Sequence, residues 1–445
     1  MQPVTNLLLV FGLLALASAS PAPIQKRGVF KVERVANPNY TGRNGPRAML
    51  KTLRKYRMPI PASVANAAQQ QNEMITKRQQ NRKKGKGHKN GKGAGAGAAA
   101  ATGAAAAGAT TQATGSAPNG TGLVTNTPEA NDVEYLSPVN IGGQTLNLDF
   151  DSGSSDLWVF NTQLSNAATQ GHTVFDPTQS KTFALMQGAS FEISYGDGSG
   201  AAGNVGTDTV DIGGATVTGQ AVELATAVSQ SFVQDTANNG LLGLAFSQLN
   251  TVQPAPQKTF FDNVKSSLAQ PLFTADLRAQ AAGAYEFGRV DTTKFTGAMT
   301  WVPVNTTDGF WQFTSQQFAV NGGTPQTSTA GAQAIADTGT TLLLADPAVA
   351  QAYYAQVQGA VDDQQQGGFT FPCNAQLPDL QLDVGGNMAT VKGTDINFTQ
   401  VDDQTCFGGL QATPAGLQVY GDIFFKSNFI AFNGGNNTLG FAQHA

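Results

Sequence analysis

The sequence predicts a mainly β protein made of two homologous lobes. Short runs rich in Val, Ile, Phe and Thr recur from about residue 130 onward, separated by Gly, Asn and Asp, which is the pattern of strands joined by tight turns. Helical windows are few in this part of the sequence, and residues 259–268 and 347–357 are the best of them. One motif also occurs twice at long spacing, so the two lobes are expected to repeat a single architecture.

The repeated motif is an aspartate that follows an apolar run and precedes a glycine flanked by Ser or Thr. The first copy lies at residues 148–159 and contains Asp151, and the second lies at residues 334–344 and contains Asp337. A second apolar element that contains glycine follows each copy later in its half. The duplication predicts that each lobe contributes one carboxylate.

The amino-terminal residues have the form of a secretory signal. An apolar run from Leu7 to Leu16 ends in the small residues Ala17, Ser18 and Ala19. This run is shorter than the about 20 apolar residues that span a bilayer. We therefore expect a signal peptide over residues 1–19, no membrane anchor, and secretion from the cell, with a vacuole as the alternative destination.

Charge is divided unevenly along the chain. Residues 1–117 contain 18 Lys and Arg and two Glu, a balance of +16, whereas the rest contains 8 Lys and Arg and 28 Asp and Glu, a balance of −20. Such asymmetry suits a nucleic-acid-binding arm or a basic segment that covers an acidic body. The secretion signal favours the second, so no nucleic-acid partner is expected. We interpret residues 20–92 as a basic inhibitory propeptide, the Ala- and Gly-rich residues 93–117 as a linker, and residues 130–300 and 301–445 as the two lobes.

The two aspartates favour acid–base chemistry with a shared proton. Each follows a predicted buried strand, and the chain then turns at Gly153 or Gly339. Two carboxylates close together resist joint ionisation, so one keeps a proton while the other is charged. The charged group can take a proton from a bound water while the protonated one donates to a peptide carbonyl oxygen. This chemistry requires no cofactor and no metal.

These motifs resemble those of the pepsin family of aspartic endopeptidases over roughly residues 130–445. They are most similar to secreted fungal members of the aspergillopepsin and penicillopepsin type. The resemblance implies a bilobed pepsin-like acid protease fold with a cleft between the lobes. It also implies an acid-active monomeric endopeptidase, made as a zymogen, that cleaves proteins and peptides beside hydrophobic residues. Its propeptide would be an intramolecular inhibitor, in which Lys51 or Lys55 of the amphipathic stretch 47–56 reaches the aspartates.

The resemblance also implies roles for residues beside the aspartates. Ser154 and Thr340 match hydroxyl residues that hydrogen-bond the outer carboxylate oxygens, and Gly153 and Gly339 match the turns. Trp158 matches the partner of a tyrosine in the hairpin flap that covers the cleft.

The flap itself is matched by residues 195–199. Tyr195, Gly196, Asp197 and Ser199 are the substrate-binding candidates in it. Asp197 resembles the acidic flap residue of fungal members that accept Lys before the scissile bond. Ser152 departs from the family, which usually has Thr there, but it retains the hydroxyl group.

The cysteines and sequons agree with an extracellular protein. Cys373 and Cys406 are the only cysteines, and one disulfide is expected in an oxidising compartment. The family has its single carboxy-terminal disulfide at a matching place. Four Asn-x-Ser/Thr sequons predict a glycoprotein, at Asn119, Asn305, Asn397 and Asn436.

Other functions fit the residues less well. A glycoside hydrolase also uses two carboxylates, but they need not lie in duplicated loops. A serine or metal hydrolase lacks its motifs here, because the body contains only His172 and His444 and has neither His-Glu-x-x-His nor Gly-x-Ser-x-Gly. A binding or inhibitor protein with a protease fold usually lacks an aspartate or the flap tyrosine, and all three are present.

Overall fold

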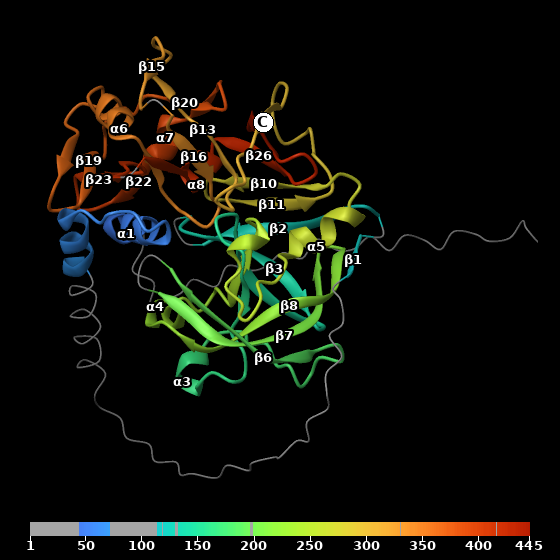
Figure 1. Ribbon diagram of the computed structural model, residues 1–445. Helices are drawn as coiled ribbons and strands as arrows, with labels where there is room; N and C mark the ends of the chain where they lie inside the picture. Colours follow the sequence, from blue (N-terminus) through green and yellow to red (C-terminus); the bar gives the residue numbers. More distant parts are fainter. Residues whose placement is uncertain are drawn as a thin grey trace, which may run out of the picture. The chain divides into compact units, whose positions relative to one another are not determined.

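The computed structural model describes residues 44–71, 114–117, 119–129, 132–195, 199–329, 331–414 and 416–445. All of these residues belong to one compact unit, residues 35–445. The predicted signal peptide and most of the predicted propeptide and linker lie outside the described residues. Strands dominate the described part of the chain (Figure 1), which confirms the mainly β fold class.

The largest sheet has fourteen strands and draws on both halves of the chain. Along most of it the order is β12-β27-β26-β10-β11-β2-β3-β4-β9-β5-β8-β7-β6, and β1 pairs with β8. The strands of this sheet are β1 (Thr114–Ser116), β2 (Gly122–Pro128), β3 (Tyr135–Ile141), β4 (Gln144–Asp151), β5 (Leu157–Val159), β6 (Ala184–Ser194), β7 (Gly200–Ile212), β8 (Ala215–Val228), β9 (Gly240–Gly243), β10 (Leu272–Arg278), β11 (Ala281–Phe287), β12 (Thr300–Pro303), β26 (Asn428–Asn433) and β27 (Thr438–Gln443).

Three smaller sheets belong to the carboxy-terminal half. Their orders are β13-β16-β25-β17-β24, β15-β14-β20-β21 and β18-β19-β23-β22. The strands are β13 (Gln312–Thr314), β14 (Gln317–Val320), β15 (Gln326–Thr327), β16 (Gln333–Ala336), β17 (Leu343–Ala345), β18 (Val361–Asp363), β19 (Gly368–Pro372), β20 (Leu380–Val384), β21 (Asn387–Val391), β22 (Asn397–Gln400), β23 (Thr405–Gly408), β24 (Leu410–Ala412) and β25 (Leu417–Tyr420).

In the described part of the chain, helices are few and mostly short, as the sequence predicts. They are α1 (Gly45–Lys55), α3 (Asn166–Thr169), α4 (Gln230–Gln234), α5 (Phe260–Val264), α6 (Pro347–Tyr354), α7 (Gly393–Ile396), α8 (Asp422–Phe425) and the 3₁₀ turns η1 (Ser247–Leu249) and η2 (Lys265–Ser267). Residues 62–71 are also helical. In the described part of the chain, no helix has the length and apolar character that crossing a membrane requires.

The two halves repeat one strand arrangement around the duplicated motif. In the first half β4 runs parallel to β9, and β9 is antiparallel to β5, which is parallel to β8. In the second half β16 runs parallel to β25, and β25 is antiparallel to β17, which is parallel to β24. The internal repeat in the sequence therefore corresponds to a structural repeat.

Two of the predicted boundaries meet the strands differently from what we expected. Residues 114–116 fall in the predicted linker but form β1, which pairs with residues 216–218, so this end of the linker assignment is wrong. The backbone hydrogen bonds of a strand order these residues despite their small side chains. The predicted division at residues 300 and 301 passes through β12, and β26 pairs with β10, so one sheet is shared by the two halves.

Helix α1 is set by a cap at its start and an apolar face. Asn44 is the N-cap, and its Oδ1 accepts a hydrogen bond from the Arg47 backbone nitrogen at 2.9 Å. Met49, Leu50 and Leu53 are buried in the same hydrophobic cluster as the cores of the sheets. Asn44 also donates through Nδ2 to Gln71 and so joins α1 to the helical residues 62–71. We refer to residues 44–71 as the inserted segment.

Candidate active site

Both aspartates of the repeated motif lie where a central strand ends. Asp151 is the last residue of β4, and Asp337 directly follows β16. Their exposed fractions are 1% and 0%. Each Oδ1 accepts a backbone hydrogen bond within its own turn, from Gly153 at 2.8 Å and from Gly339 at 3.0 Å.

The two turns face each other so closely that only glycine fits in them. A Cβ atom at Gly153 would lie 2.5 Å from Asp337 Oδ1, and one at Gly339 would overlap the Asp151 carboxyl group. The structure therefore brings together the two aspartates and both glycines that the sequence predicts. Hydroxyl groups hold the outer oxygens, since Ser154 donates to Asp151 Oδ2 at 2.6 Å and Thr340 donates to Asp337 Oδ2.

A second set of hydroxyl contacts ties the two turns together. The Ser152 backbone nitrogen donates to Thr338 Oγ1 at 3.0 Å, and the Thr338 nitrogen donates to Ser152 Oγ at 2.9 Å. Ser152 Oγ also donates to the Ala336 carbonyl, and Thr338 Oγ1 donates to the Phe150 carbonyl. We did not single out Thr338 from the sequence, although it occupies the same place in its motif as Ser152. Ser152 can make the contacts of the threonine that is usual at this position, because these contacts require only the hydroxyl group.

Two side chains of the inserted segment occupy the space at the aspartates. Lys55 Nζ lies 2.7 Å from Asp151 Oδ1 and 3.0 Å from both carboxylate oxygens of Asp337. Tyr56 Oη donates to Asp337 Oδ2 at 2.6 Å. Of the two lysines left open by the sequence, Lys55 reaches the aspartates, whereas Lys51 pairs with Glu134 at 3.4 Å. Tyr56 was not identified from the sequence.

The two aspartates differ in acidity because their partners differ. Burial raises the pKa of Asp151, and the Lys55 charge only partly offsets this. Burial acts in the same direction on Asp337, but the Lys55 charge and the hydrogen bonds of Asp151, Thr340 and Tyr56 together lower its pKa to about 2. The pKa of Lys55 is raised, since the two carboxyl groups outweigh its own burial. In this state the ammonium is charged, and Asp337 is the more acidic of the two carboxyl groups.

The base of the predicted flap stands at the end of β6. Trp158 Nε1 donates to Tyr195 Oη at 2.7 Å, the pairing that the resemblance implies. The Tyr195 backbone nitrogen donates to the Ser199 carbonyl at 2.7 Å, which closes the hairpin. Phe232 of α4 packs edge-on against both Trp158 and Tyr195. Gly196 and Asp197, the other two flap candidates, lie outside the described residues.

Comparison with known proteins decides the family. The family model described as eukaryotic aspartyl protease matches residues 134–444. The chain belongs to this family.

This aspartyl protease is similar to several fungal enzymes. Aspergillopepsin-1 of Aspergillus clavatus is 42% identical over 440 residues, which is 98% of each chain. Endothiapepsin of Cryphonectria parasitica is 44% identical over 424 residues, 94% of this chain and 90% of that one. Penicillopepsin-1 of Penicillium janthinellum is 50% identical over 326 residues, 73% of this chain and 99% of that one. The predicted resemblance and enzyme class are confirmed: the protein is an aspartic-type endopeptidase, and its substrates are proteins and peptides.

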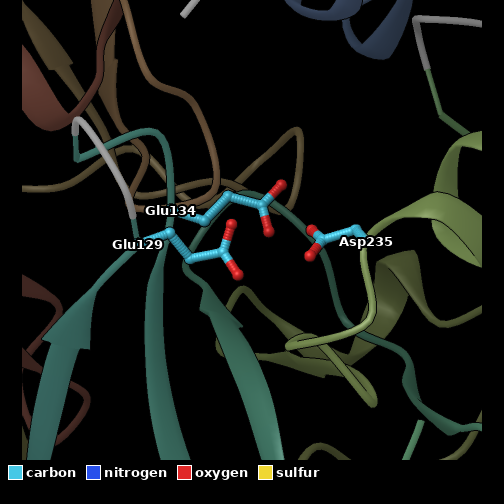
Figure 2. A group of neighbouring side chains, drawn as sticks. All are labelled: Glu129, Glu134 and Asp235. Carbon is cyan, nitrogen blue, oxygen red and sulfur yellow. The ribbon is translucent and has the colours of Figure 1, made fainter. Parts of the chain in front are cut away.

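Three further acidic side chains of the aspartyl protease lie close together near Lys51. Figure 2 shows these side chains, Glu129, Glu134 and Asp235. Each has a carboxylate oxygen within 4.8 Å of the others. Burial raises the pKa of Glu129 to about 10, and the charges of Asp235 and Glu134 add to this shift. Burial also raises the pKa of Asp235 to about 7, where the Glu134 charge adds to the shift and the hydrogen bond of Glu129 opposes it. Oxygen atoms of this kind can bind a divalent cation. In this structure Lys51, through its ion pair with Glu134, brings positive charge to the group.

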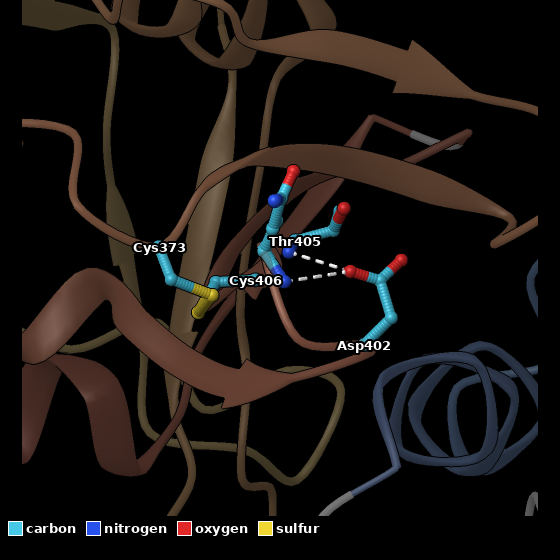
Figure 3. Close-up of a disulfide and its surroundings, with 5 residues drawn as sticks. Cys373, Asp402, Thr405 and Cys406 are labelled. Carbon is cyan, nitrogen blue, oxygen red and sulfur yellow. Dashed lines mark hydrogen bonds between the residues drawn. A yellow bond between two sulfur atoms is a disulfide. The ribbon is translucent and has the colours of Figure 1, made fainter.

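The predicted disulfide of the aspartyl protease is present. Cys373 and Cys406 are bonded, with their Cα atoms 4.9 Å apart (Figure 3), and Cys406 lies on β23. Asp402 Oδ1 accepts the backbone hydrogen bonds of residues 404 and 405 in the turn before β23. The next residue on this strand, Phe407, packs directly against Gly45 of α1, where any Cβ atom would overlap its ring. The disulfide thus braces a strand on which the inserted segment rests.

Proposed function

We propose that Asp151 and Asp337 are the catalytic pair and that the chain is made as a zymogen, which the inserted segment keeps inactive. The observation that carries this proposal is the position of Lys55 Nζ, within 3.0 Å of oxygens from both carboxyl groups. A water molecule at the same place would contact both carboxyl groups. Lys55 and Tyr56 would therefore exclude both the water and the substrate.

In the proposed reaction the two carboxyl groups exchange roles through proton transfer. The ionised one takes a proton from water as the water oxygen attacks the peptide carbonyl carbon, and the protonated one gives its proton to the carbonyl oxygen. A neutral tetrahedral diol results. One carboxyl group then protonates the amide nitrogen while the other accepts a proton from a hydroxyl of the diol, and the C–N bond breaks. Asp337 is the more acidic partner in the inhibited chain, but once Lys55 leaves, the pair titrates as one unit.

Acid would release the inserted segment because its ion pairs depend on ionised carboxyl groups. Lys55 pairs with both aspartates and Lys51 pairs with Glu134. The formal charges of the basic and acidic parts, +16 and −20, favour the covered state at neutral pH. Protonation of the carboxyl groups weakens this attraction, while the buried Met49, Leu50 and Leu53 keep the segment bound until enough pairs are lost.

A preference for hydrophobic residues follows from the aromatic side chains around the aspartates. Trp158, Tyr195 and Phe232 pack together on the flap side. On the other side Phe310 packs edge-on against the Tyr56 ring, with the ring centroids 5.4 Å apart. A hydrophobic substrate side chain would take the place of the Tyr56 ring. Acceptance of Lys through Asp197 remains a prediction.

We also propose that the protein is a secreted monomeric glycoprotein. The four sequon asparagines, Asn119, Asn305, Asn397 and Asn436, are exposed, as a glycan requires. Together with the predicted signal peptide, this exposure supports passage through the secretory route.

Cleavage of denatured haemoglobin by the acid-treated chain tests the catalytic assignment. We expect the wild type to cleave at about pH 3–4 and Asp151→Asn and Asp337→Asn to be inert, because an amide can neither take nor share the proton. Asp362→Asn, at an exposed position on β18, is the matched control and should cleave like the wild type. Full activity in either dyad variant would contradict the catalytic assignment.

A further inference from the structure

A second pair of carboxyl groups lies buried beside the Asp151 turn. Asp156 directly precedes β5, and Glu223 lies on β8 opposite Trp158 in the strand register. Each is 1% exposed. None of the ion pairs among the described residues involves either carboxyl group. No positive charge therefore compensates this pair directly.

The hydrogen bonds that other residues donate to the pair leave one carboxylate oxygen of each side chain without a donor. Asp156 Oδ1 accepts from the Thr251 backbone nitrogen at 2.8 Å and from Asn250 Nδ2 at 2.9 Å. Glu223 Oε1 accepts from the same Asn250 nitrogen at 3.0 Å. Asp156 Oδ2 and Glu223 Oε2 are buried and receive no donor from any group in the described part of the chain. The two carboxyl groups lie close together, because both accept from one nitrogen, Asn250 Nδ2, at 2.9 and 3.0 Å.

Two carboxylates cannot hydrogen-bond each other unless one of them holds a proton, since each has only acceptors. We propose that Glu223 carries this proton, donates it to Asp156, and with Asp156 forms a positioning pair for the catalytic cleft. The inference rests on the proposed function of Asp151 and Asp337, because it concerns how that site is held. Neither residue of the pair touches the substrate, so neither is a catalytic residue.

The pair connects to both sides of the cleft floor. Asn250, which bridges the two carboxyl groups, also donates to the Ser155 carbonyl in the Asp151 turn, at 3.2 Å. The Asp156 carbonyl accepts the backbone hydrogen bond of Gly243 at 2.8 Å. Glu223 stands opposite Trp158, the residue that holds the flap tyrosine. Loss of the shared proton would put two negative charges into this buried network and separate the strands that carry these groups.

The electrostatics of the surroundings act in the same direction. Burial raises the pKa of Glu223 well above its usual range, and the Asp156 charge adds to the shift. Burial also raises the pKa of Asp156, against the hydrogen bonds of Thr251 and Glu223. Asp151 and Tyr195 are titratable groups that interact with the pair, and neither can supply a positive charge.

The sign of the pH dependence follows from these directions. A carboxyl group whose pKa is higher in the folded than in the unfolded chain stabilises the fold at low pH. That stabilisation is lost as the pH rises through the folded-state pKa. The Asp156–Glu223 pair therefore sets the upper limit of the pH range in which the amino-terminal half of the enzyme stays folded. It leaves the activity at acid pH unaffected.

Replacing Glu223 by Gln tests the shared proton. Glu223→Gln supplies an amide that donates to Asp156 at any pH, whereas Glu223→Ala removes the donor. We expect Glu223→Gln to keep the acid kcat/KM within about twofold and to lengthen the half-life of the folded chain at about pH 7–8 by about tenfold or more, because one pKa unit equals a factor of ten. Glu223→Ala should shorten the half-life. Glu192→Gln, at an exposed position on β6, is the matched control and should change neither quantity.

An infrared measurement detects the proton without any use of activity. The spectrum of Glu223→Gln is subtracted from that of the wild type at about pH 6.5, where ordinary carboxyl groups are ionised. The difference spectrum should show the C=O stretch of a protonated carboxyl group. Asp156→Asn, which places the permanent donor on the other side, should resist neutral pH as Glu223→Gln does. An absent band, or neutral-pH half-lives equal to wild type in both amide variants, overturns the proposal. An inactive wild-type chain that still shows the band would instead defeat only the proposed function.

Discussion

Replacing Lys55 by Met should make the chain lose its inhibition by the inserted segment faster, and at higher pH, than the wild type. Lys55 Nζ makes three short contacts with the two aspartates, and its side chain is 7% exposed, so solvent barely screens the interaction. Removing one partner of a buried ion pair costs about 3–5 kcal/mol. This corresponds to a roughly 100- to 4,000-fold weaker hold of the inserted segment. We expect the lower end, because the aspartate pair can take up a proton once the ammonium is gone.

Lys51→Met is the matched control for this prediction. The Lys51–Glu134 pair is longer, at 3.4 Å, and its side chains are 24% and 20% exposed. Such partly exposed pairs contribute about 1 kcal/mol or less, so activation should speed up by less than about fivefold. The assay follows the cleavage of a fluorogenic peptide after the full chain is moved from neutral pH to about pH 5. This pH lies above the range in which Asp337 takes up a proton in the wild type.

The pH dependence gives the same experiment a second readout. The folded-state pKa of Asp337, about 2, lies below its ordinary value. The ionised Asp337 therefore stabilises the bound inserted segment fully above about pH 4, and this stabilisation is lost as the pH falls towards 2. In the wild type, rapid activation should therefore begin below about pH 4. In Lys55→Met it should begin at higher pH. Equal activation of the Lys51 and Lys55 variants, or a Lys55 variant that behaves like the wild type, would refute the reasoning.

Three further substitutions probe the cleft and its supports. Ser152→Ala removes the hydrogen bonds of the Ser152 hydroxyl with the Ala336 carbonyl and the Thr338 nitrogen, and it should lower the free energy of unfolding by about 1–3 kcal/mol. Ser152→Thr should keep this free energy, as thermal unfolding would reveal. Trp158→Phe removes the donor to Tyr195 and should raise KM several-fold more than it lowers kcat, as peptide kinetics would show. Cys406→Ser opens the disulfide and should cost about 2–4 kcal/mol in denaturant unfolding; an unchanged midpoint would contradict this.

The sequence predicts much of the site because its signals are local or duplicated. An apolar run, an aspartate, a glycine and a hydroxyl residue within a few positions specify a strand, a turn and a hydrogen bond, so Ser154 and Thr340 could be identified without coordinates. Their repetition in the second half predicts the two-lobed arrangement. The disulfide followed from a count of two cysteines. The resemblance supplied the Trp158–Tyr195 pairing, which composition alone could not have given.

Other parts of the site depend on contacts between distant segments and were decided only by the tertiary structure. Lys51 and Lys55 are one helical turn apart on the same face of α1, so the pattern of the sequence cannot choose between them. The choice depends on how deeply each end of α1 enters the body, where Lys55 is 7% exposed and Lys51 is 24% exposed. Tyr56 was missed for the same reason.

The buried carboxyl pair could not have been predicted from the sequence. Asp156 and Glu223 lie far apart in the chain and belong to no motif that predicts a contact. Parallel pairing of β5 with β8 brings their two segments together, and Asn250 then bridges the two carboxyl groups. The sequence by itself determined the strands, the duplicated turns and the two catalytic candidates, because short-range patterns encode them. The tertiary structure alone decided which charged groups meet and where a proton must be shared, because these depend on burial and on distances between strands.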